Sequence, residues 1–176
     1  MINNRISDPF FWESKRKGCN CGSYALGIDS WFIPYDEDEF DYGGRDGFIS
    51  ALFEDGRDVD TIMDILLASD EEGILEQCPW IVSVDRDEIT DDDTIIAYRL
   101  ALEIDKFSND ESECIFADYI DTDFHFRIRR NGVWKEKCGS EPIITCKEQT
   151  WEEFEKPWDT GYGVIYSSKI LYFKYK

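Results

Sequence analysis

The sequence has no hydrophobic stretch approaching 18 residues and no uninterrupted apolar segment near residue 1. A membrane-spanning helix needs about 20 apolar residues, and a secretory signal needs an apolar core. We therefore predict a cytoplasmic protein with no membrane contact. Internal repeats and low-complexity linkers are also missing from the sequence. Because domains usually run to about 100–200 residues, we expect a single domain over residues 1–176.

Basic residues are scarce: 19 Lys and Arg stand against 39 Asp and Glu, for a formal net charge of −20. The acidic segment, residues 36–93, holds three basic and 21 acidic residues and so carries −18 of that charge. Binding to a nucleic-acid backbone or an anionic membrane requires Lys and Arg. We therefore expect no direct nucleic-acid partner. The acidic segment permits a basic protein partner, a cationic substrate or imitation of a nucleic acid. The alternative is that these charges form a solvated face that keeps the protein soluble.

Without a secretory signal, cysteines are more often free thiols, metal ligands or nucleophiles than disulfides. The sequence has six: Cys19, Cys21, Cys78, Cys114, Cys138 and Cys146. A four-thiolate zinc set would use Cys19, Cys21, Cys138 and Cys146. Their spacings differ from the paired C-x₂₋₄-C units of zinc ribbons and fingers, and we expect no metal and no cofactor.

Hydrophobic periodicity changes along the chain from helical to strand-like. Apolar residues at helical spacing predict short helices at 21–28, 48–53 and 61–67, with a loop at 34–47 and a turn at 70–73. After Pro79, strands are predicted at 80–84, 94–104, 124–130, 133–137 and within 166–176, and residues 85–93 form an exposed acidic loop. Helices followed by a run of antiparallel strands indicate an α+β fold.

Asn131 and Gly132 form the strongest short hairpin signal in the chain. If they are the two turn residues, the pairing runs back along the strands until His125 lies opposite Cys138. One face of the hairpin then carries His125, Trp134, Glu136 and Cys138. Glu136 lies diagonally across from His125, within the ~7–8 Å reach of such neighbours.

A cysteine hydrolase needs a thiolate beside an imidazole, a third group that orients the ring, and backbone donors for the oxyanion. Cys21 fits because Asn20 precedes it as an N-cap, and a helix start lowers a thiol pKa and offers free N–H groups. Basic residues at 15–17 would lower that pKa further, and Gly22 would leave space beside the sulfur for a substrate. Cys19 is a rival or resolving thiol, and a buried structural cysteine is the plain alternative.

His125 is the only histidine in the chain. It is therefore the candidate general base, and a structural histidine in a strand is its plain alternative. Glu136 is the best local candidate to orient the ring. Asp123 and Asp121 are rivals for that role, although Asp123 would have to reach sideways from its place two residues before His125.

The strings NCGSYALG (20–27) and DFHFRIRRNGVWKEKCGS (123–140) resemble a group of small bacterial and phage proteins. Their pattern is an Asn-Cys-x-x-Tyr-Ala-Leu helix, then an Asp-[Phe/Tyr]-His strand followed by Gly-x-Trp-x-x-Lys-x-Gly. These proteins are similar to papain-like cysteine peptidases, whose cysteine opens a helix and whose histidine lies on a following sheet. The resemblance implies a papain-like fold with N-terminal helices packed on an antiparallel sheet, Cys21 as nucleophile and His125 as base.

Two functions are therefore expected. The first is a thiol hydrolase acting on a peptide or protein substrate, in which Cys21 attacks the carbonyl, His125 carries the proton and Glu136 orients the ring. The Cys21 amide and the Asn20 side chain would hold the oxyanion. The alternative is a non-catalytic binding protein, such as a phage inhibitor, a nucleic-acid mimic or an immunity-type protein, acting through the acidic segment.

Overall fold

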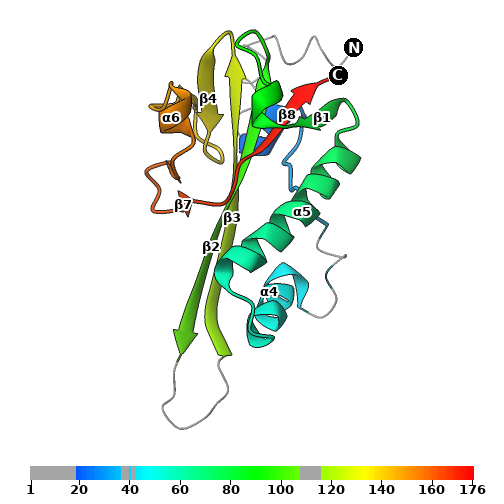
Figure 1. Cartoon of the computed structure of the whole chain (residues 1–176), viewed down its shortest axis with the longest axis vertical. Helices are drawn as coiled ribbons and strands as arrows, with labels where there is room; N and C mark the ends of the chain where they lie inside the picture. Colours follow the sequence, from blue (N-terminus) through cyan, green and yellow to red (C-terminus); the bar gives the residue numbers. More distant parts are fainter. Residues whose placement is uncertain (1–18, 37–39, 41–42, 108–115) are drawn as a thin grey trace.

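A six-stranded antiparallel sheet runs through the computed structural model, which describes residues 19–36, 40, 43–107 and 116–176 (Figure 1). The strand order is β1-β8-β2-β3-β4-β5. The strands are β1 (Ile81–Val84), β2 (Ile95–Phe107), β3 (Phe116–Arg130), β4 (Val133–Lys137), β5 (Ile143–Thr145) and β8 (Leu171–Tyr175). The C-terminal strand lies between β1 and β2, which fits its largely apolar sequence.

The hairpin between β3 and β4 has the predicted turn and register. Asn131 and Gly132 have φ values of 49° and 76°, the left-handed pair that a type I′ turn requires. The ladder runs from Arg130 opposite Val133 to Arg127 opposite Glu136. However, β3 begins at residue 116, eight residues before its predicted start, because acids at 118, 121 and 123 mask the apolar alternation in the sequence.

Helices cover one face of the sheet, and a smaller group of elements covers the other (Figure 1). The first face carries α3 (Cys21–Leu26), α4 (Gly44–Glu54) and α5 (Val59–Gln77). The second carries α6 (Trp151–Phe154) and the two-stranded sheet of β6 (Trp158–Asp159) and β7 (Ile165–Tyr166). The α+β prediction is confirmed. Within the described residues, no helix has the length and apolar character needed to span a membrane.

The turn predicted at residues 70–73 is wrong, because α5 continues through it. Asp70 is fully buried, and its carboxylate accepts bonds of 2.6 and 2.8 Å from the Arg45 guanidinium. Gly73 packs against the backbone of Pro34, and a Cβ there would come within 2.2 Å of the Pro34 carbonyl oxygen. These residues are polar or small because of tertiary contacts, which local periodicity does not reveal. The predicted loop at 34–47 is also too long, since α4 begins at residue 44.

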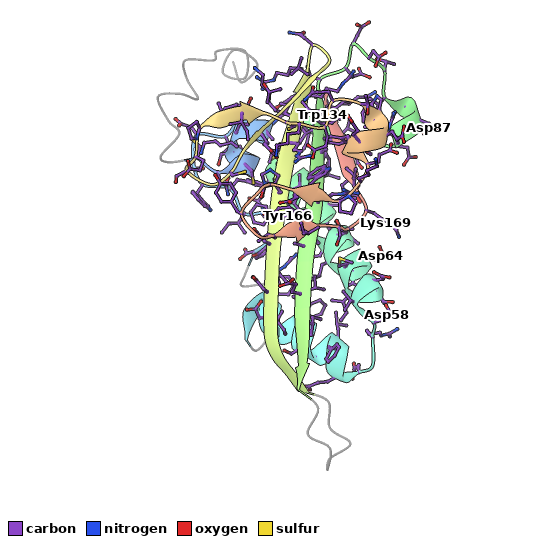
Figure 2. All side chains as sticks on the ribbon, turned by 90° about the vertical axis from the view of Figure 1, so that its left-hand side faces the viewer. Asp58, Asp64, Asp87, Trp134, Tyr166 and Lys169 are labelled. Atoms are coloured by element: carbon purple, nitrogen blue, oxygen red, sulfur yellow. The ribbon has the colours of Figure 1, made fainter. Side chains whose placement is uncertain are left out.

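Two separate hydrophobic cores flank the sheet. Alternation along β3 sends Phe126 and Ile128 to the core beneath the three helices. Trp134 of β4 enters the other core, where its ring stacks on Phe154 with centroids 3.6 Å apart. Figure 2 looks onto this second face and shows Trp134 and Tyr166 in front of the long strands. His125, in the same alternation, therefore faces the second core, whereas α3 packs against the first.

Candidate active site

Cys21 is the first residue of α3, and Asn20 caps that helix as predicted. The Asn20 Oδ1 accepts the Ser23 N–H at 3.0 Å, and its Nδ2 donates to the Phe32 carbonyl at 2.6 Å. The amides of Cys21 and Gly22 come before the capped one, at positions where a helix supplies no acceptor of its own. The side-chain amide of Asn20, predicted to hold an oxyanion, thus uses one of its N–H bonds to fix the loop at Phe32.

Gly22 lets α3 approach β3 closely. A Cβ at this position would lie 2.7 Å from a ring carbon of Phe32 and 3.2 Å from one of Phe126. The prediction that Gly22 leaves room for a substrate is therefore wrong, because two aromatic rings occupy that space. Its role is in packing.

The Cys21 thiol is buried, at 5% exposure, and donates to the Phe124 carbonyl at 3.9 Å. Burial raises its pKa to about 12, and the charge of Asp123 adds to this rise, while the backbone N–H of Phe126 opposes it. The prediction of a lowered pKa is wrong for this resting arrangement, because desolvation outweighs the helix start. The basic residues at 15–17 lie outside the described residues.

The His125 ring is held by Glu136 across the β3–β4 hairpin. Its Nε2 lies 2.9 Å from the Glu136 Oε2, as the diagonal pairing predicted. The same oxygen accepts a bond of 2.7 Å from Arg127 Nε, and Arg127 Nη1 reaches Glu148 at 3.3 Å. Because a carboxylate only accepts hydrogen bonds, the imidazole proton sits on Nε2. Nδ1 is then the nitrogen that can take a further proton.

Glu136 is an ionised carboxylate in a buried position. Burial works to raise its pKa, but the hydrogen bond from His125 and the charge of Arg127 hold the pKa below its ordinary value. Asp123 and Asp121, the two alternatives to Glu136 for orienting the His125 ring, have other contacts. Asp123 accepts a 2.6 Å bond from the Tyr166 hydroxyl, and Asp121 lines a different, polar pocket.

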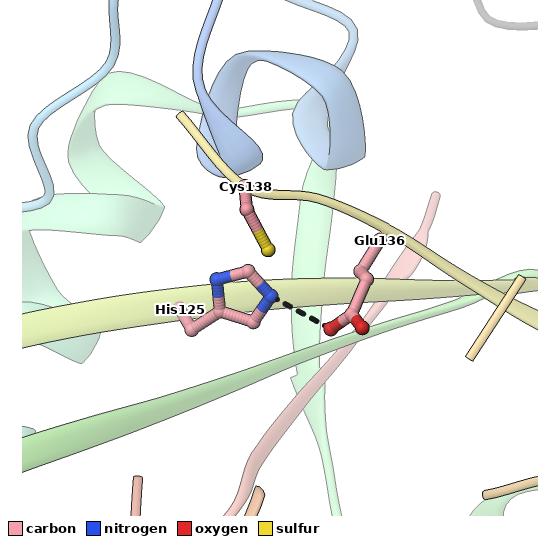
Figure 3. Close-up of side chains that lie close together, drawn as sticks. All are labelled: His125, Glu136 and Cys138. Carbon is pink, nitrogen blue, oxygen red and sulfur yellow. Dashed lines mark hydrogen bonds and ion pairs between the residues drawn. The ribbon is translucent and has the colours of Figure 1, made fainter. Parts of the chain in front are cut away.

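Cys138 is a second thiol at the site; from the sequence it was considered only as a possible zinc ligand and as a residue on the His125 face of the hairpin. A nitrogen of His125, a carboxylate oxygen of Glu136 and the Cys138 Sγ all lie within 4.8 Å of one another. Figure 3 shows the thiol directed at the imidazole ring. Cys138 is half-buried; burial raises its pKa to about 11, and the charge of Glu136 contributes to the rise. The predicted hairpin register already placed it opposite His125, and that signal could have identified it.

The remaining described cysteines do not form the alternative zinc set. Cys19 is buried in the helix-side core and Cys146 in the core on the other face. Among the described residues, the group suited to a metal is instead His125, Glu136 and Cys138. Among the described cysteines, Cys21, Cys78, Cys138 and Cys146 are free thiols. Cys114 lies outside the described residues.

A cavity of about 500 Å³ connects these groups. Its walls include both Cys21 and His125, together with Cys138, Asp123, Glu141 and Tyr166. The rim is apolar, with Trp31 at 55% and Tyr162 at 64% exposure. The described lining contains two carboxylates and neither Lys nor Arg. The cavity therefore suits an apolar group that is neutral or positively charged.

Lys137 links the segment that leads into Cys21 to the segment that follows Cys138. Its ammonium is fully buried and donates to the carbonyl of Cys19, at 2.5 Å, and to that of Gly139. Burial lowers the pKa of Lys137, and the nearby thiols of Cys21 and Cys138 oppose that shift. This contact fixes the start of α3 against the end of β4.

Comparison of the chain with protein-family models, with curated proteins and with solved structures found no match.

Proposed function

We propose that the chain is a papain-like thiol hydrolase of the cytoplasm, with Cys21 as nucleophile and His125 as general base, acting on peptide or amide bonds. The observation that carries the proposal is the His125–Glu136 contact of 2.9 Å in the wall of a cavity that also contains Cys21. An imidazole oriented by a buried carboxylate beside a thiol is the arrangement that nucleophilic acyl transfer requires.

The placement of these groups supports the papain-like part of the proposal. Cys21 opens a helix that packs on an antiparallel sheet, His125 lies on a strand of that sheet, and Glu136 lies on the neighbouring strand. The resemblance to papain-like peptidases implied the places of Cys21 and His125, and the hairpin register gave that of Glu136.

In the proposed reaction, the Cys21 thiol leaves the Phe124 carbonyl and gives its proton to Nδ1 of His125. The sulfur attacks the substrate carbonyl, and the amides of Cys21 and Gly22 stabilise the oxyanion. The imidazolium then protonates the leaving amine as the C–N bond breaks. Water attacks the thioester after giving a proton to His125, which returns that proton to the sulfur as the acid product leaves.

Alkylation kinetics test the proposal, because the chain offers a matched control. Burial raises the pKa of both Cys21 and Cys78 to about 12, but Cys78 is sealed in the core. At pH 7, iodoacetamide should modify Cys21 faster than Cys78, and His125→Asn should slow the modification of Cys21 but not that of Cys78. The two sites, and Cys138 as the competing thiol, are resolved by peptide mass mapping. Equal rates at Cys21 and Cys78 would reject Cys21 as the nucleophile.

A second candidate function is a binding protein that works through the acidic segment. The observation that favours it is a set of exposed carboxylates along α5 and at its N-cap. They are Asp60, Asp64, Glu72 and Glu76 in the helix, and Asp58 at the cap. Figure 2 shows Asp58 and Asp64 at the outer side of this helix. Here, reversing these charges should abolish a salt-sensitive complex with a basic protein, while Cys21→Ala leaves the complex intact.

A further inference from the structure

Three different metal-binding atom types come together beside the cavity, whose lining includes His125 and Cys138 but not Glu136. They are a ring nitrogen of His125, a carboxylate oxygen of Glu136 and the sulfur of Cys138, all within 4.8 Å of one another (Figure 3). His125 and Glu136 are almost fully buried, whereas Cys138 is half-buried on the cavity side. The first two side chains come from adjacent paired strands, and Cys138 directly follows β4, so the backbone holds the group together.

We propose that His125, Glu136 and Cys138 bind a single Zn²⁺ ion, with the cavity supplying the open fourth position. One nitrogen, one oxygen and one sulfur ligand suit zinc, and sites with three protein ligands keep a place for water or another small ligand. Mg²⁺ and Ca²⁺ are poor candidates because they require sets of oxygen ligands. Ligand atoms less than 4.8 Å apart need only small side-chain movements to reach zinc at about 2.0–2.3 Å.

The charges around the group are mixed. The positive charge of Arg127, which contacts Glu136, disfavours a metal cation at the same carboxylate. Arg127 also forms an ion pair with Glu148, which partly neutralises that charge. Asp123 and Glu141 add two carboxylates to the cavity wall. Arg127 also fixes one oxygen of Glu136, and such outer contacts orient a ligand for its metal.

Zinc at this position would occupy the imidazole of His125, which lines the cavity. The proposed hydrolase would then lose its general base and be reversibly inhibited, a consequence that rests on the proposed function. Binding of the ion does not rest on it, since Cys21 is not one of the three ligands.

Titration of the full chain with Co²⁺, a spectroscopic substitute for Zn²⁺, tests the proposal. The wild type should bind one ion and show a thiolate-to-cobalt charge-transfer band that Zn²⁺ abolishes. Cys138→Ala and Cys138→Ser should both lose this band and weaken Zn²⁺ binding at least about 100-fold, more than the loss of an outer contact costs. His125→Asn should weaken binding similarly, and the control Cys78→Ala should bind normally.

A band that survives both Cys138 substitutions, or a wild type that binds no Co²⁺ or Zn²⁺, would overturn the proposal. Far-UV circular dichroism of each variant separates loss of a ligand from loss of the fold, and the serine variant preserves the side-chain size. Cys21→Ala keeps this result distinct from the proposed function. This variant should retain the full charge-transfer band. If the band disappeared in Cys21→Ala, Cys21 would be a metal ligand and the proposed site would be rejected.

Discussion

Replacing Glu136 by Gln removes the charge that His125 and Arg127 share in a buried position. Glu136 is 4% exposed and accepts bonds of 2.9 and 2.7 Å from these two partners. Removing one member of a buried ion pair costs about 3–5 kcal/mol, because the remaining charge is left uncompensated. Arg127 keeps a contact with Glu148, so we expect the lower value, ~3 kcal/mol. For a chain of this length, that corresponds to a Tm lower by about 6–12 °C.

Glu148→Gln is the matched control, because it removes a carboxylate from the same Arg127. Glu148 is 25% exposed and its contact is longer, at 3.3 Å, so its loss should cost less than about 1 kcal/mol. Urea unfolding at pH 7 measures both free energies of unfolding. Equal losses in the two variants, or a loss below about 1 kcal/mol for Glu136→Gln, would refute the reasoning from burial.

The difference in stability between the wild type and Glu136→Gln should depend on pH in a defined direction. The pKa of Glu136 in the folded chain lies below its ordinary value of 4.5. Its carboxylate therefore contributes its full stabilisation above about pH 4.5, and that contribution disappears as the pH falls through the folded pKa. The stability difference between the wild type and Glu136→Gln should be constant near neutral pH and shrink in acid. A difference that grows in acid would contradict the assignment.

Three further predictions concern Gly73, Asp70 and Cys138. Gly73→Ala should lower the free energy of unfolding by about 1–3 kcal/mol, since its Cβ would meet the Pro34 carbonyl; a neutral effect in urea would contradict that packing. Asp70→Asn should cost about 3–5 kcal/mol because it removes the buried negative charge that binds the Arg45 guanidinium, and a loss below about 1 kcal/mol in thermal unfolding would contradict this. Burial raises the pKa of Cys138 to about 11, so its alkylation rate should rise about tenfold per pH unit from 7 to 10, and a plateau near pH 8 would reject the shift.

The sequence predicted best where the structure is determined locally. Asn131 and Gly132 adopt the φ values that a two-residue hairpin demands, and the turn then set the register that brings Glu136 to His125. The cap at Asn20 was predictable for the same reason, because it involves atoms only a few residues apart.

Long-range contacts explain what sequence analysis missed. Asp70 and Gly73 read as turn residues, but a buried arginine and a close backbone contact place them inside a helix. The Cys21 pKa was predicted with the wrong sign, because folding buries the thiol, which contacts Phe124 about 100 residues away in the sequence. Cys138 was placed correctly by the register, yet its closeness to the imidazole emerged only from side-chain positions.

Covalent trapping with a substrate-like reagent tests the central claim most directly. A peptidyl chloromethyl ketone with an apolar side chain matches the cavity, and peptide mapping locates the adduct it forms. We predict one adduct per chain on Cys21 at neutral pH, lost in His125→Asn and retained in Cys138→Ala. An adduct on Cys138, or one on Cys21 that forms equally fast without His125, would contradict the pairing of Cys21 with His125.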